Sequence, residues 1–202
     1  KKPKVVHLEA LGREDMPELM AELKKRGADQ RLKPQTVCAL LMAIYTGLRD
    51  HSIRGATWSE IDIKQRKWTV PKTRMKSGRE HAVPLPAQAI TALEDLRPLT
   101  YRSADSFVFS AKTKTGYLAE NTLRMALHRL GFKVTVHGFR SLITDYLSED
   151  SRWSIGAIEK QLDHQERNQV RKAYLRTEFW QERVKMMAEF ADWCDGTRAP
   201  RL

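Results

Sequence analysis

The spacing of apolar residues changes twice along this chain, and that change limits the possible folds more than any other feature. From Trp58 to Leu85 apolar residues alternate with polar ones, as in strands that bury one face. On both sides of this segment they recur every three or four residues, which is the spacing of one helix face. Ser77-Gly78 is a turn signal within the alternating segment, and Pro84 marks the end or the edge of its last strand. The sequence therefore predicts an α+β fold that is mainly α, with a small three-stranded antiparallel sheet.

The helical spacing divides the rest of the chain into separate stretches. They are residues 14–26, 34–46, 87–96, 120–130, 138–147, 155–162 and 178–193. The second stretch has a single apolar stripe, formed by Val37, Leu40, Leu41 and Ile44. Gly47 follows this stretch directly, and a helix that ends there would hold Arg49 rigidly where a ligand can reach it. Helices and strands do not alternate, so a doubly wound parallel sheet is not expected.

The charge of the chain indicates a polyanionic partner such as nucleic acid. The net charge is +11 and the pI is near 9.8. Residues 64–79 hold seven Lys or Arg and no acid, whereas residues 137–180 hold seven basic and seven acidic residues, so the excess is patched. Cys38 and Cys194 have no metal-binding spacing and are expected to be free thiols in a reducing cytoplasm. The longest apolar run, residues 38–45, is too short to span a bilayer, and the chain opens without a signal-like segment or a methionine, as a fragment would.

A set of residues in the C-terminal third, together with one arginine upstream, could bind and react with a phosphate. His137-Gly138-Phe139-Arg140 is followed by His164 and Tyr174, and Arg49 lies far upstream. Two guanidinium groups can grip one phosphate because their paired N–H groups match its geometry. Histidine can pass or hold a proton near neutral pH, and a tyrosine hydroxyl can attack a phosphate to form a covalent intermediate.

The order of these residues resembles the catalytic domain of the tyrosine recombinases, the phage-integrase family. The motifs are Thr-Gly-Leu-Arg49, a basic hairpin, His137-Gly-Phe-Arg140, Leu-Asp-His164 and a tyrosine ten residues later. Any one of them would be an ordinary surface or core feature; their joint occurrence from about residue 36 to about residue 190 carries the resemblance. It implies site-specific recombination, in phage or prophage integration or excision, by cleavage and rejoining of DNA through a 3′-phosphotyrosine. It implies neither a metal nor another cofactor, because the phosphotyrosyl bond keeps the energy of the broken linkage.

The resemblance assigns six residues to catalysis. They are Arg49, Lys76, His137, Arg140, His164 and Tyr174. The arginines would hold the scissile phosphate, His137 would assist proton transfer, and His164 would hydrogen-bond the phosphate. Lys76, preferred over Lys72, would protonate the leaving 5′ oxygen. Tyr174 would be the nucleophile, because no other tyrosine follows a Leu-x-His motif.

Further basic residues near these motifs are expected to contact DNA phosphates. They are Lys72, Arg74, Arg79, Arg171 and Lys172. The resemblance also implies a division into residues 1–35 as a lead-in with the first helix, 36–195 as the catalytic domain and 196–202 as a tail. Upstream DNA-binding domains, usual in full-length integrases, are not part of this sequence. The partners implied are double-stranded DNA and three further copies in a homo-tetramer on DNA, with a monomer in isolation and no membrane, in the cytoplasm of a bacterial host.

One position departs from the family pattern and leaves alternatives open. Many members carry an acid three residues after the first arginine, where this chain has Ser52. Asp50 or Glu60 could compensate. Two other functions remain at this point: a type IB topoisomerase, and a DNA-binding module that has lost catalysis, for which Ser52 is the only support. The apolar positions of residues 179–193 either dock onto a neighbouring subunit or fold back onto their own domain.

Overall fold

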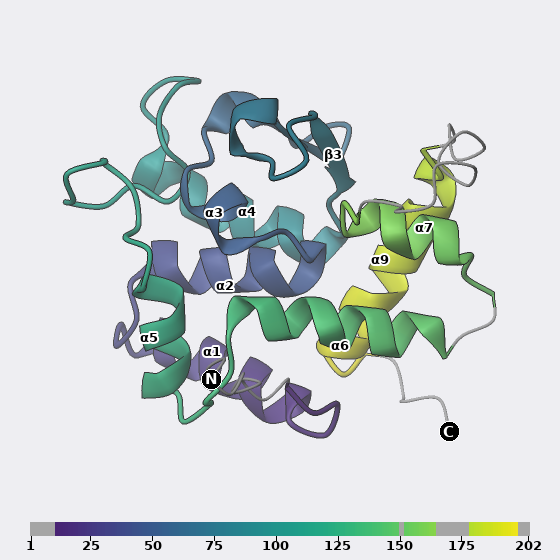
Figure 1. Cartoon of the computed structure of the whole chain (residues 1–202). Helices are drawn as coiled ribbons and strands as arrows, with labels where there is room; N and C mark the ends of the chain where they lie inside the picture. Colours follow the sequence, from purple (N-terminus) through teal and green to yellow (C-terminus); the bar gives the residue numbers. More distant parts are fainter. Residues whose placement is uncertain (1–10, 150–151, 165–177, 198–202) are drawn as a thin grey trace, which may run out of the picture.

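Helices form most of the molecule, and a small sheet lies at one side of the helical body (Figure 1). The computed structural model describes residues 11–149, 152–164 and 178–197. Its α-helices are α1 (Met16–Ala28), α2 (Pro34–Thr46), α3 (Asp50–Arg54), α4 (Ala87–Thr100), α5 (Thr122–Arg129), α6 (Val136–Ser148), α7 (Ile155–Gln161) and α9 (Trp180–Cys194). Two short 3-10 helices are η1 (Trp58–Glu60) and η2 (Lys72–Arg74). The predicted fold class, mainly α with a small sheet, is confirmed.

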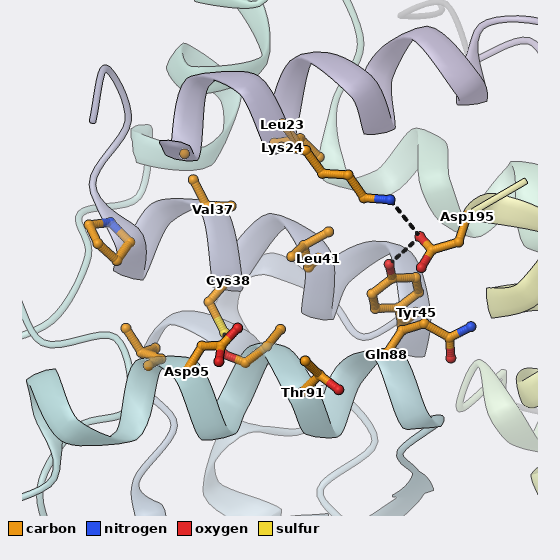
Figure 2. Close-up of a pocket in the computed structure, with 14 residues that line it drawn as sticks. Leu23, Lys24, Val37, Cys38, Leu41, Tyr45, Gln88, Thr91, Asp95 and Asp195 are labelled. Carbon is orange, nitrogen blue, oxygen red and sulfur yellow. Dashed lines mark hydrogen bonds and ion pairs between the residues drawn. The ribbon is translucent and has the colours of Figure 1, made fainter. Parts of the chain in front are cut away.

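Helix α2 lies at the centre of the molecule, where α1, α4, α5, α6 and α9 all pack against it. Gly47 ends the helix as predicted, with a φ of 67°. Leu40 of the predicted stripe is fully buried, but so is Met42, which lies outside the stripe. Val37 and Leu41 are only half-buried because they face a pocket between α1 and α4 (Figure 2). The prediction of a single apolar stripe is therefore wrong for α2, since neighbouring helices surround it on nearly all sides.

The sheet has the predicted three antiparallel strands. They are β1 (Ile61–Asp62), β2 (Lys67–Val70) and β3 (His81–Pro84), in the order β1-β2-β3. Trp68 lies opposite Val83 in the register, and both side chains are fully buried. Pro84 is the last residue of β3, as expected for a residue without an N–H to donate. Trp58 belongs to η1 and not to a strand, so the extended segment begins later than the alternation suggests.

Several helix boundaries differ from the predicted ones by one or two residues, and α4 differs by more. Helix α4 continues past Leu96 to Thr100 although Pro98 lies in its last turn. A proline there removes one N–H and does not by itself undo the turn. The buried Thr100 hydroxyl accepts a hydrogen bond from the indole of Trp58 at 3.3 Å, which fixes this extra turn. Helix α3 is not predicted, because its five residues are too few to show a period.

Helix α9 folds back onto its own domain and is part of the core. It packs against α7, α2, β3, α6 and α1. Met186, Met187 and Phe190 are all buried on this face. Of the two expectations for this segment, folding back is the one that the structure shows. Docking onto a neighbouring subunit in an assembly stays a prediction; in this chain the apolar face of α9 is already covered.

Buried polar contacts fix α9 in this place. Arg183 has no exposed surface; its Nε donates to Oε1 of Gln161 at 3.0 Å, and its Nη2 donates to the carbonyl of Ala82 at 2.6 Å. Burial lowers the pKa of Arg183 to about 10, so the group stays charged at neutral pH. The guanidinium thus links α9 to α7 and to β3.

The far end of α9 is tied to the centre of the molecule beside the pocket drawn in Figure 2. The Tyr45 hydroxyl donates to Oδ1 of Asp195 at 2.7 Å, and Nζ of Lys24 lies 3.9 Å from the same oxygen. This pocket, of about 420 Å³, is largely apolar and contains none of the predicted site residues. The contacts of Asp195 therefore serve the packing of α9 against α1 and α2.

The described residues contain neither a disulfide nor a membrane-spanning helix. Cys38 and Cys194 are both buried free thiols, as predicted. Burial raises the pKa of both thiols, which keeps them protonated and unreactive at neutral pH. Within the ranges given above, no helix combines the length and apolar character needed to cross a bilayer.

Candidate functional site

Residues from distant parts of the sequence meet in a pocket of about 500 Å³. Its lining residues are Arg49, Asp50, His51, Arg54, Glu120, His137 and Arg140. The junction of α2 and α3 supplies one part of the wall, and the first turns of α6 supply another. Three of the six predicted catalytic residues, Arg49, His137 and Arg140, are thereby brought together.

Arg140 is the rigid cation of this pocket. Only 4% of the residue is exposed, and its Nη1 and Nη2 donate to the carbonyls of Gly47 at 2.5 Å and Leu162 at 2.6 Å. Its buried Nε has no hydrogen-bond partner within the described residues. Burial, followed by the nearby charge of Arg49, lowers the pKa of Arg140 to about 10, while Asp163 acts in the opposite direction. The guanidinium therefore stays charged at neutral pH and is held in place by backbone on two sides.

Arg49 is the more open cation. It lies in extended conformation between Gly47 and α3, and its side chain is 30% exposed. Its Nη1 donates to Oδ2 of Asp163 at 3.3 Å. Two cations so close together repel each other, and a phosphate between them would relieve that repulsion.

The two predicted histidines differ in their relation to this pocket. His137 is an exposed residue in the first turn of α6. Partial burial of its ring, followed by the charges of Arg140, Arg49 and His164, lowers the pKa of His137, so the imidazole is neutral at neutral pH and can accept a proton. His164 does not line the pocket; its Nδ1 lies 3.3 Å from Oε1 of Glu159. The influence of His164 on the pKa of His137 nevertheless places the two rings in one electrostatic environment.

Lys76 is exposed in the turn between η2 and β3 and does not line the pocket. The segment before it is held from two sides. The Ser52 hydroxyl donates to the carbonyl of Arg74 at 3.0 Å, and Nη1 of Arg74 donates to Oε1 of Glu60 at 2.7 Å. A second short ion pair joins Arg74 to the other oxygen of Glu60. The base of the turn that carries Lys76 is thus anchored while the lysine itself is left free to reach solvent.

The proposed DNA contacts in this segment are not equivalent. Lys72 and Arg79 are exposed. The Arg74 side chain is only 16% exposed, and besides Glu60 it binds the carbonyl of Gly55 at 2.6 Å. Its guanidinium is therefore engaged within the protein, which gives Arg74 a structural role.

The missing acid at position 52 is not replaced by either expected carboxylate. Ser52 is 2% exposed and faces the segment of Arg74. Asp50 binds Nε of Arg54 at 2.6 Å, and Glu60 binds Arg74. The carboxylate that reaches Arg49 belongs to Asp163, which the sequence reading took only as the middle residue of Leu-x-His. Its partner is 114 positions away in the sequence, so no local pattern reveals it.

Tyr174, Arg171 and Lys172 lie outside the described residues. Their predicted roles, as nucleophile and as DNA contacts, stay predictions.

The fold is the one found in integrases and recombinases of known structure. It is similar to the integrase from mycobacterium phage Brujita, with a TM-score of 0.65 and 19% identity over the whole of this chain and 62% of that one. It is also similar to XerA recombinase, with a TM-score of 0.62 and 16% identity over the whole of this chain and 68% of that one.

Sequence comparison then identifies the family. Residues 9–180 match the phage integrase family, and the chain belongs to it. It is 34% identical to the integrase of Enterobacteria phage P4 over 96% of this chain and 47% of the relative. It is 30% identical to prophage integrase IntA of Escherichia coli K12 over 95% of this chain and 45% of the relative. The chain spans about half the length of these curated relatives.

Proposed function

We propose that this chain is the catalytic domain of a site-specific recombinase, which cleaves and rejoins double-stranded DNA through a 3′-phosphotyrosine during phage or prophage integration or excision. The observation that carries the proposal is the meeting of Arg49, Arg140 and His137 in one pocket. Phage and prophage integrases among the curated relatives support the same reading. The reaction would take place in the cytoplasm of a bacterial host.

The two arginines would stabilise the transition state. The scissile phosphate gains negative charge as it becomes pentacoordinate, and cations fixed beforehand lower the barrier without reorganising. Arg140 is fixed by two carbonyls, and Arg49 keeps an exposed edge for the substrate. His164 would add a hydrogen bond to the phosphate.

Two proton transfers would accompany the phosphoryl transfer. The Tyr174 oxygen attacks phosphorus, and the bond from phosphorus to the 5′ oxygen breaks. The neutral His137 accepts the phenol proton, and Lys76 donates a proton to the leaving 5′ oxygen. Rejoining reverses these steps with a new 5′ hydroxyl, so the bond energy is retained and neither ATP nor a metal has to take part.

The nucleophile can be tested by a single hydroxyl deletion. Tyr174→Phe should abolish SDS-stable DNA adducts on nicked suicide duplexes and leave non-covalent binding unchanged, because only the attacking oxygen is lost. Tyr101→Phe, a partly exposed tyrosine outside the pocket, is the matched control and should retain adduct formation. Adducts formed by Tyr174→Phe would refute the assignment of the nucleophile. Loss of adduct formation by the parent chain in excess chelator would also count against the mechanism, which needs no metal.

DNA binding and assembly are the remaining parts of this proposal. Exposed Lys72 and Arg79, together with Arg171 and Lys172, would bind phosphates, so affinity should fall steeply with salt through counterion release. Four copies would assemble on two duplexes, which light scattering with and without DNA can check. The degraded-module alternative loses its support, because Ser52 has its own structural partner and does not line the pocket.

A further inference from the structure

The carboxylate of Asp163 occupies an unusual place in the pocket region. Its side chain is 10% exposed, and Oδ2 lies 3.3 Å from Nη1 of Arg49. The residue has a φ of 48°, in the left-handed region that side chains other than glycine seldom adopt. Asp tolerates this conformation better than most residues, yet a strained, largely buried anion calls for an explanation.

The neighbours of Asp163 show that this loop sets the position of both arginines. Nε2 of Gln161 donates to the carbonyl of Thr46 at 2.8 Å. The carbonyl of Leu162 accepts from Arg140 at 2.6 Å. Asp163 then binds Arg49, so the last residue of α7 and the two residues that follow it bind the end of α2 and both cations in turn. The separation of the two guanidinium groups thus depends on this one loop.

Asp163 is also the only carboxylate that forms an ion pair with Arg49 within the described ranges. Asp50 is paired with Arg54, and Glu120 is exposed at the pocket edge without an ion pair to Arg49. A negative charge next to a phosphate site weakens phosphate binding, so its value must lie in orienting the cation.

We propose that Asp163 is a positioning residue: its carboxylate holds one N–H edge of Arg49 and directs the remaining donors toward the scissile phosphate. Asp163 thus provides the acid that is missing at position 52, although it lies 114 positions from Arg49 in the sequence. This inference rests on the proposed function for its effect on cleavage, whereas its effect on Arg49 can be measured without any reaction.

The central variant is Asp163→Asn, which keeps the shape and the tolerance of left-handed backbone but removes the charge. Covalent adduct formation at saturating DNA should slow by up to about 100-fold, the cost that a misplacement of about 1 Å can have. Non-covalent affinity should stay equal or become tighter, because one anion beside the phosphate is lost. A role in stability alone would not produce this opposition between binding and cleavage.

The substrates for this test are nicked suicide duplexes that the parent chain has selected from a random-sequence pool by forming adducts. Asp163→Gly removes the carboxylate and also the backbone strain, and it should slow cleavage as much as Asp163→Asn. Asp105→Asn makes the same charge change at an exposed site outside the pocket and should cleave like the parent. The double variant Asp163→Asn, Arg49→Lys should cleave only slightly more slowly than Arg49→Lys alone, because the acid acts through Arg49.

A second readout separates this inference from the proposed function. In the DNA-free protein labelled with ¹⁵N-arginine, the Nη signals of Arg49, assigned by their loss in Arg49→Lys, should be resolved because the ion pair slows rotation of the guanidinium. They should merge or broaden in Asp163→Asn. Unchanged Arg49 signals, or cleavage by Asp163→Asn at the parental rate, would overturn the role of Asp163. Absence of adducts from the parent would refute the proposed function and leave the Arg49 signals to decide the inference.

Discussion

Replacing Gly47 by alanine tests whether the end of α2 is packed as closely as the structure shows. Gly47 has a φ of 67°, and an added Cβ would lie 2.7 Å from Cδ2 of Leu162 and 2.9 Å from Cδ1 of Ile143. Both contact residues are fully buried. The carbonyl of Gly47 also accepts a hydrogen bond from Arg140, so a shift here moves a cation that we propose to act in catalysis.

The cost has two parts. A residue with a Cβ at this φ loses about 1–2 kcal/mol. Relief of the two short contacts within a filled core adds about 1–3 kcal/mol. The unfolding free energy should therefore fall by about 2–5 kcal/mol, measured by urea denaturation followed by circular dichroism.

The chain offers a matched control in the β2–β3 turn. Gly78 has a φ of 68°, and an added Cβ there meets nothing within 4 Å. Gly78→Ala should therefore lose only the backbone part, about 1–2 kcal/mol. Equal losses in the two variants would refute the packing argument. Gly47→Ala should also form adducts more slowly at saturating DNA under conditions where it stays folded, because the carbonyl of residue 47, which accepts a hydrogen bond from Arg140, is displaced.

Three further changes follow from burial. Ser52→Glu should lower the unfolding free energy by about 3 kcal/mol or more, because a buried carboxylate would face the Arg74 carbonyl in place of a hydroxyl donor; a variant as stable as the parent in urea would contradict this. Deletion of residues 178–202 should abolish cooperative unfolding and the near-ultraviolet dichroism, since Phe190 and its neighbours belong to the core; a truncated chain that folds and binds DNA would show the reverse. Burial lowers the pKa of His81 to about 4, so its neutral form stabilises the fold above pH 6.5 and this contribution is lost as the pH falls toward 4. The loss should reach about 3 kcal/mol in urea titrations, and His81→Gln should show a smaller dependence on pH over that interval.

The parts of the fold that the sequence predicts are those with a local cause. The helical period of residues 14–26 and the alternation around Trp68 show directly in the order of side chains. A helix forms over Met16–Ala28, two residues later than predicted, and a strand forms over Lys67–Val70. Gly47 likewise marks the end of α2 by itself. Family motifs extend this to the site, because Arg49 and Arg140 are recognisable without knowing how the chain brings them together.

The roles of the other side chains depend on contacts with residues distant in the sequence, which the sequence alone does not reveal. Ser52 reads as a lost acid until the carbonyl of Arg74 is seen beside it. Arg74 reads as a DNA contact in a basic run, but Glu60 and the Gly55 carbonyl occupy its guanidinium. Asp163 appears as a spacer within a motif although it binds Arg49. In each case the side chain's role is set by a residue far along the chain, and residue type alone leaves several roles open.

The buried position of Arg183 has a consequence for any assembly of several copies. If α9 of one copy packed onto a neighbouring copy, two acceptors in the first copy, Oε1 of Gln161 and the carbonyl of Ala82, would lose their buried donor. Only a helix that brings a guanidinium to the same depth could fill that vacancy. Any exchange of α9 would therefore have to give every copy an equivalent helix, because a helix with an apolar residue at this position would leave both buried acceptors unsatisfied. The residue at position 183 would then restrict which copies could exchange this helix.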